Sequence, residues 1–168
     1  MSAYLDFLAR KRIADPSTGI SRPGELLACM KPHQSDITSW ALRRGRAAVF
    51  AGTGLGKTLM ELTWGARVAE HTGKPVLCFA PLAVAAQHLR EAAKFGLHSD
   101  IAKPDCVLPV GVHVTNYQKI DHFDLSQFGG VILDESSILK STEGHYRTRL
   151  INECAQVPFR LAATATPA

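Results

Sequence analysis

Two kinds of segment alternate along this chain of 168 residues. Short runs that are apolar at every position are separated by longer segments in which apolar residues recur at helical spacing. Strands that are apolar on both faces and alternate with helices predict an α/β fold, a mostly parallel sheet with helices on both faces. The expected strands are residues 46–50, 75–80, 112–115, 130–134 and 159–163, and the expected helices are residues 4–11, 33–43, 57–71, 83–95 and 146–155.

One stretch, residues 97–110, follows neither pattern. Pro104 and Pro109 predict an irregular connection there. Elsewhere the polar motifs of the chain come directly after the apolar runs. Because ligands of parallel sheets bind at the carboxyl ends of the strands, these motifs predict a site at that edge of the sheet.

The composition, with 46% hydrophobic and 20% charged residues, is typical of one soluble globular domain. No apolar stretch approaches the roughly 20 residues that cross a membrane, and the amino terminus lacks the basic start and apolar core of a secretory signal. We therefore expect no membrane partner and a location in the cytoplasm. The four cysteines are widely separated, which favours free thiols over disulfides or zinc ligands. The net charge of +4 agrees with a polyanionic partner and equally with an ordinary solvated surface.

The segment at residues 51–58, Ala-Gly-Thr-Gly-Leu-Gly-Lys-Thr, lies between an expected strand and an expected helix. Its glycines allow backbone N–H groups to turn toward a phosphate, and the helix adds the positive end of its dipole. Lys57 would reach the β- and γ-phosphates of a triphosphate, and Thr58 would offer its hydroxyl to Mg²⁺. Ala51 departs from the strict Walker pattern, which has glycine there, and a glycine turn without a ligand is the alternative. The expected nucleotide-binding residues of this loop are Gly52, Thr53, Gly54, Leu55, Gly56, Lys57 and Thr58.

Two adjacent carboxylates, Asp134 and Glu135, follow the apolar run at residues 130–133. Adjacent side chains leaving a strand diverge, so that Asp134 would hold Mg²⁺ through its water shell while Glu135 would orient and deprotonate the attacking water. Alone, such a pair is a common surface turn. Together with the phosphate loop it predicts a catalytic set of Lys57, Asp134 and Glu135, with Thr58 and Asp134 at the metal.

Two further motifs complete the pattern. The amide of Gln34 has both a donor and an acceptor for the edge of an adenine, which favours ATP, although the same residues also read as an ordinary helix start. Thr164 and Thr166 follow the last apolar run, where their hydroxyls would touch the Asp134–Glu135 pair and sense the γ-phosphate. A capped turn before Pro167 is the alternative.

The order of these motifs resembles that of superfamily 2 helicases and translocases over nearly the whole chain from Lys31 to Pro167. The resemblance implies a RecA-like P-loop NTPase lobe over residues 31–168, preceded by a helix and loop extension over residues 1–30. In family order, the similar segments are residues 31–34 (the adenine motif), 51–58 (motif I), 80–82 (motif Ia), 114–117 (motif Ib), 134–137 (motif II) and 164–166 (motif III).

A lysine a few residues after motif II, Lys140, resembles the Swi/Snf-type branch, and the overall arrangement resembles DEAD/DEAH-box helicases encoded by bacteriophages. The resemblance implies ATP and Mg²⁺ as cofactors and nucleic acid as the partner, with DNA favoured over RNA through the Swi/Snf likeness. It also implies that motifs Ia and Ib face the nucleic-acid strand, and exposed side chains on the helix after motif Ia would add to that face. The residues expected there are Pro81, Leu82, Gln87, Arg90, Thr115, Asn116 and Tyr117.

The family builds its active site between two RecA-like lobes, and the sequence ends just after motif III. The arginine that stabilises the transferring phosphate normally comes from the second lobe, which we expect in the same or another chain, and such an arginine contributes about 10³- to 10⁵-fold in rate. We therefore expect weak ATP–Mg²⁺ binding, slow or no turnover by this chain alone, and a fragment of a longer protein. A stand-alone interaction or competitor module with the same fold remains a second hypothesis, and a simpler P-loop NTPase such as a kinase a third.

Overall fold

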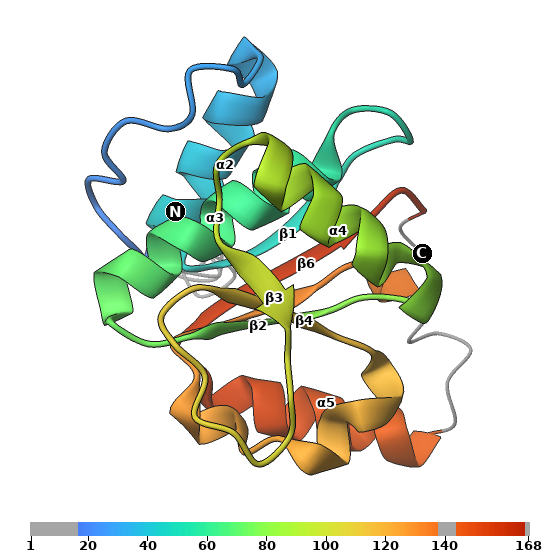
Figure 1. Cartoon of the computed structure of the whole chain (residues 1–168). Coiled ribbons are helices and arrows are strands. Elements are labelled where there is room, and N and C mark those ends of the chain that lie inside the picture. Colours follow the sequence, from blue (N-terminus) through green and yellow to red (C-terminus); the bar gives the residue numbers. More distant parts are fainter. Residues whose placement is uncertain (1–16, 138–143, 167–168) are drawn as a thin grey trace, which may run out of the picture.

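The computed structural model describes residues 17–137 and 144–166, so the expected helix at residues 4–11 lies outside the described residues. The described chain forms one sheet in which every pairing is parallel, in the order β1-β6-β5-β2-β4-β3 (Figure 1). The strands are β1 (Arg46–Phe50), β2 (Val76–Phe79), β3 (Ser99–Ile101), β4 (Val112–Thr115), β5 (Gly130–Leu133) and β6 (Phe159–Thr164). The helices are α2 (Pro32–Arg44), α3 (Lys57–Thr72), α4 (Leu82–Lys94) and α5 (Gly144–Gln156), with short 3₁₀ turns η1 (Tyr117–His122) and η2 (Leu125–Gln127).

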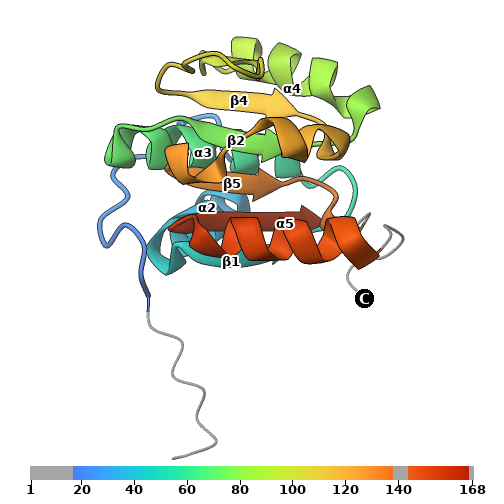
Figure 2. The same ribbon diagram turned by 90° about the horizontal axis from the view of Figure 1, so that it is seen from below.

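The helices lie on both faces of the sheet, as expected. Helices α2, α3 and α4 cover one face, and α5 with the 3₁₀ turns covers the other (Figures 1 and 2). Because a crossover between parallel strands is right-handed, its direction along the sheet decides which face its connection covers. The path from β1 through β2 to β3 runs one way, and the path from β3 through β4 and β5 to β6 runs back, so the two sets of connections lie on opposite faces.

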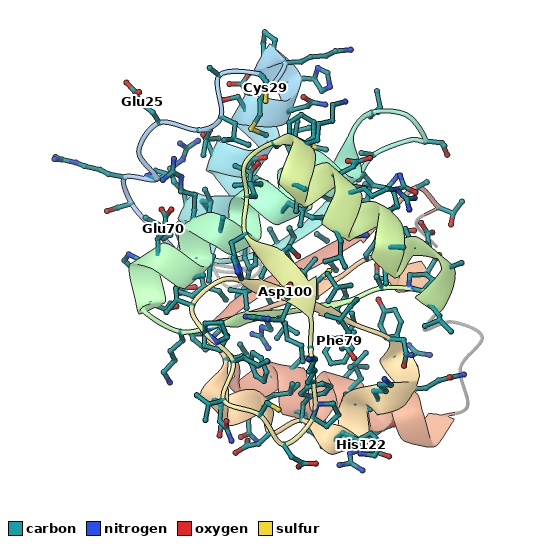
Figure 3. The ribbon with its side chains drawn as sticks, viewed as in Figure 1. Glu25, Cys29, Glu70, Phe79, Asp100 and His122 are labelled. Carbon is teal, nitrogen blue, oxygen red and sulfur yellow. The ribbon has the colours of Figure 1, made fainter. Side chains whose placement is uncertain are left out.

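Two apolar clusters fill the spaces above and below the sheet. The cluster under α3 includes Trp64 and Leu62, both almost completely buried. The cluster on the α5 side includes Leu77, Phe79 and Ile120, and Figure 3 shows Phe79 on this side of the sheet. Strand β2 contributes to both clusters because its side chains alternate between the two faces.

Most expected elements are present, with ends shifted by one or two residues. Strand β1 has the expected bounds. The expectation for residues 97–110 was wrong in part, because Ser99–Ile101 forms β3 and pairs with β4 at the edge of the sheet. This strand is short and partly exposed, so it lacks the apolar run by which the inner strands are recognised.

The amino-terminal extension contributes to the same core. Backbone N–H groups of Gly19 and Ile20 donate to the carbonyls of Arg43 and Leu42 at the end of α2. Ile20 is buried within the cluster under α3. None of the described helices combines the length and apolar character that crossing a bilayer requires.

Candidate functional site

The loop between β1 and α3 has the backbone geometry of an anion-binding turn. Gly54 and Gly56 adopt left-handed conformations, with φ of 82° and 79°, which glycine reaches without steric cost. Gly56 is the N-cap of α3, so the first turn of this helix and its positive dipole end adjoin the loop. The loop residues Gly52, Thr53, Gly54 and Leu55 are exposed. Such a turn accepts a phosphate group.

Lys57 directs its ammonium group back over this loop. Its Nζ donates to the carbonyl of Ala51 at 2.9 Å and to that of Gly52 at 3.4 Å. The side chain is half-buried, and the hydroxyl residue Thr58 follows it at the start of α3. A cation, exposed backbone and a helix start thus lie together, which is the donor set that fits a polyphosphate.

Gln34 is buried against the loop from α2. Its Oε1 accepts from the backbone N–H of Lys31 and its Nε2 donates to the carbonyl of Leu55, both at 2.9 Å. A Cβ placed on Gly56 would lie 2.3 Å from this Nε2. Gln34 therefore braces the loop. One N–H and one oxygen lone pair remain beyond these bonds, and adenine recognition by them stays a prediction.

Asp134 follows β5 and is only 7% exposed. Its backbone N–H donates to the carbonyl of Phe79, and its own carbonyl accepts from the hydroxyl of Tyr117 at 2.7 Å. Burial, together with the negative charge of Glu61, raises the pKa of Asp134 to about 7, while the charge of His88 acts in the opposite direction. The carboxyl group is therefore held in a site of low polarity at the end of the strand.

Glu135, the next residue, has a different environment. Its backbone is left-handed with a φ of 51°, and its Oε1 accepts from Ser137 Oγ at 2.7 Å and from Thr164 Oγ1 at 2.9 Å. The hydrogen bond from Ser137 lowers the pKa of Glu135 and outweighs the opposite effect of burial, and the bond from Thr164 and the charge of Lys57 lower it further. Lys57 and Glu135 therefore lie at the same edge of the sheet.

The two threonines at the end of β6 take separate positions, with Thr164 the last residue of the strand and Thr166 beyond it. Thr164 is buried and contacts Glu135, whereas the backbone N–H of Thr166 donates to Thr164 Oγ1 at 3.1 Å. The contact with the carboxylate pair and the capped turn are thus both present. Strand β6 lies between β1 and β5, which places its end beside both the phosphate loop and Glu135.

Some of the residues expected on the nucleic-acid face are exposed, and others are buried. Pro81 precedes α4, and Leu82, Gln87 and Arg90 on this helix are exposed. Thr115 corrects the expectation, because it ends β4 between two other strands and is only 4% exposed.

The two residues after Thr115 are partly buried. Asn116 is half-buried, and its Oδ1 is covered. The ring of Tyr117 stacks on Phe79 at 5.7 Å between centroids, and its hydroxyl is bonded to the carbonyl of Asp134. Tyr117 therefore holds the backbone at Asp134 in place, and its hydroxyl points into the protein instead of toward a bound ligand.

Two residues at this edge were missed by the sequence reasoning. Glu61 on α3 and His88 on α4 are almost completely buried, and His88 Nε2 lies 3.4 Å from Glu61 Oε2 and 3.5 Å from Asp134 Oδ2. The available signal was the spacing of Glu61, four residues after Lys57, which places both on one face of a helix.

The sheet order, the crossover pattern and the glycine loop define the class of fold, a RecA-like α/β lobe. No family model matches the sequence, and no curated protein matches it. Solved structures do match the fold. The Sulfolobus solfataricus SWI2/SNF2 ATPase core in complex with dsDNA aligns with a TM-score of 0.70 and 21% identity, over 87% of this chain and 34% of that one.

Two helicase structures align with this chain about as well as the SWI2/SNF2 core does. The UvsW helicase from bacteriophage T4 aligns with a TM-score of 0.68 and 18% identity, over 97% of this chain and 60% of that chain. The Pyrococcus furiosus Hef helicase domain aligns with a TM-score of 0.67 and 19% identity, over 86% and 36% of the two chains. The described chain thus shares its RecA-like α/β fold with these structures, and it spans only part of each of these proteins.

Proposed function

We propose that this chain is the ATP-binding lobe of a nucleic-acid-dependent ATPase of the helicase type. The observation that carries the proposal is the meeting of three elements at one edge of the sheet. The glycine loop follows β1, and its Lys57 lies near enough to Glu135 for its charge to act on that carboxylate. Thr164 ends β6, which lies between β1 and β5, and donates to Glu135. The fold likeness to helicase structures supports the same assignment.

Each group has a distinct role in this proposal. The loop and Lys57 bind the phosphates of ATP, Gln34 braces the loop and meets the adenine, and Thr58 and Asp134 hold Mg²⁺. Glu135 orients the attacking water and accepts its proton, which suits its lowered pKa and ionised state. Thr164, with Thr166, relays the state of the γ-phosphate from Glu135 to the rest of the protein.

We further propose that residues 31–168 form this lobe, with residues 1–30 as an extension, and that a second lobe in this or another chain completes the site. Nucleic acid, with DNA favoured over RNA, would contact the exposed residues Leu82, Gln87 and Arg90. The T4 protein among the similar structures agrees with a phage origin, for which a host-cytoplasm location follows.

Nucleotide binding tests the proposal directly. We expect Lys57→Ala to weaken the affinity for a fluorescent ATP analogue with Mg²⁺ by about 10- to 100-fold, the effect of one hydrogen bond to a charged group. Lys74→Ala, which removes an exposed lysine just before β2 at the opposite edge of the sheet, is the matched control and should leave the affinity unchanged. Equal affinities for wild type and Lys57→Ala would instead favour an interaction module that keeps the fold without using nucleotide.

A further inference from the structure

We propose that Glu61 and His88 form a buried support that positions the Asp134 carboxylate, with His88 as the positioning residue. The inference rests on the proposed function, because it concerns the group that would hold Mg²⁺ there. It assigns a role to two charged side chains that the phosphate loop and motif II do not themselves include.

The three groups form a continuous contact in a site closed to solvent. His88 is 0% exposed, Glu61 1% and Asp134 7%. The ring Nε2 lies between Glu61 Oε2 and Asp134 Oδ2, and Nδ1 lies 3.2 Å from the carbonyl of Val84 one turn earlier on α4. The bond to Val84 fixes the ring, so that Nε2 is directed at the two carboxylates.

Every neighbour of the two ring nitrogens is a hydrogen-bond acceptor. The ring therefore donates from Nδ1 to Val84 and from Nε2 toward the carboxylates. Two buried carboxylates facing each other without a donor between them would repel, and removing one partner of a buried charge pair is strongly unfavourable. His88 thus holds the Asp134 carboxyl group at a fixed position at the end of β5.

The support also connects the two halves of the phosphate site. Glu61 lies one helical turn after Lys57 on α3, His88 lies on α4, and Asp134 follows β5. Helices α3 and α4 pack side by side on one face of the sheet, and α3 also packs against β5 (Figure 1). Glu61 and His88 therefore link the helix that begins at the glycine loop to the carboxylate that follows β5.

The expected consequence is a defect specific to Mg²⁺. The double variant Glu61→Leu/His88→Phe removes the buried acid together with its partner and so protects folding. In this variant we expect the Mg²⁺ concentration for half-maximal ATP-analogue binding to rise about fivefold or more, as is typical when groups that hold a metal ligand in place are removed. Binding in the presence of EDTA should be unchanged. In the single variant His88→Gln the amide can still donate a hydrogen bond, so we expect a Mg²⁺ response close to that of wild type.

His113→Phe is the matched control, because His113 is also buried, 1% exposed, and its Nε2 contacts the carbonyl of Pro109 instead of a carboxylate. Thermal unfolding shows that each variant is folded. A folded double variant with the wild-type Mg²⁺ response would overturn the inference while leaving the proposed function intact. The inference would also be overturned if purified wild type retained a stoichiometric metal ion that His88→Phe lost. Glu61, His88 and Asp134 would then be metal ligands.

A spectroscopic measurement keeps the inference testable if wild type binds no nucleotide and the proposed function fails. In nitrogen-15 NMR at neutral pH, we expect both ring N–H protons of His88 to be observed, with the Nε2 signal displaced in Asp134→Asn and unchanged in Lys57→Ala. A His88 ring with a single proton, or one indifferent to Asp134→Asn, would contradict the proposed support.

Discussion

Neighbouring residues at the candidate site have opposite environments, and this difference assigns their chemistry. Burial raises the pKa of Asp134 to about 7, whereas hydrogen bonds from Ser137 and Thr164 lower the pKa of Glu135. Adjacent carboxyl groups whose environments move their pKa values apart are typical of catalytic pairs. A positive φ at Glu135 turns its side chain away from the burial site of Asp134 and toward Thr164. In the proposed function, one group of this pair serves the metal and the other the water molecule.

The bond between Thr164 and Glu135 leads to a prediction about stability. Thr164→Val removes a donor to Glu135 and the acceptor of the Thr166 N–H, so we expect a loss of about 1 to 3 kcal/mol in the free energy of unfolding. Thr38→Val is the matched control, because Thr38 is equally buried and its hydroxyl finds no hydrogen-bond partner within the described part of the chain. Urea unfolding measures both, and equal effects would show that the bond to Glu135 contributes little.

Among the elements, the start of α3 combines several features of the candidate site. The helix begins directly after two left-handed glycines, and α2 packs beside it so that Gln34 reaches the carbonyl of Leu55. The loop conformation therefore depends on a second helix as well as on its own glycines. Its geometry is set by α2 before any ligand binds, which reduces the entropy lost on binding.

Substitution of Gly56 tests this dependence. In Gly56→Ala the left-handed backbone costs roughly 1 to 2 kcal/mol, and the new Cβ must also displace Gln34 from Leu55. Gly73→Ala at the other end of α3 has a φ of 66° and open space around the Cβ, so only the backbone cost applies. We expect Gly56→Ala to be the more destabilising in urea unfolding. In a Gln34→Ala background the two alanine variants should become equal, and a persistent difference would argue against the brace.

The molecule as a whole is one lobe, with the site open at the carboxyl edge of its sheet. Helices on both faces fix the sheet, and the loops at this edge carry the phosphate loop, both carboxylates and the threonine after β6. The chain spans 34% of the SWI2/SNF2 core and 60% of the UvsW chain. In the proposed function, the groups that close over the transferring phosphate come from a second lobe.

At this scale we expect the 168-residue chain to bind ATP–Mg²⁺ weakly and to hydrolyse it at a rate close to background, because an arginine supplied by another lobe contributes about 10³- to 10⁵-fold. Phosphate release with and without double-stranded DNA measures the rate, and Glu135→Gln defines the background. Hydrolysis that DNA stimulates strongly and that Glu135→Gln abolishes would show that this lobe alone completes the active site.

The sequence by itself determined the features that depend on local pattern. Apolar runs identified five of the six strands, β1 with its observed bounds, and the glycine spacing and paired carboxylates identified the loop and the end of β5. Hydrophobic periodicity and motif spacing depend only on residues close together in the sequence, so these features can be recognised without knowledge of the fold. The edge strand β3 was missed because a short, half-exposed strand has no such pattern.

Only the tertiary structure decided which distant residues meet. The packing of α4 on α3 brings His88 to Glu61 and Asp134, a contact that no motif predicted. The order of the strands, with β6 between β1 and β5, explains how Thr164 makes its predicted contact with Glu135. The same packing buries Thr115, which the sequence had placed on a binding face. Burial and side-chain contacts depend on the order of strands and the crossing of helices, and these follow from the packing of the whole chain rather than from the spacing of any one motif.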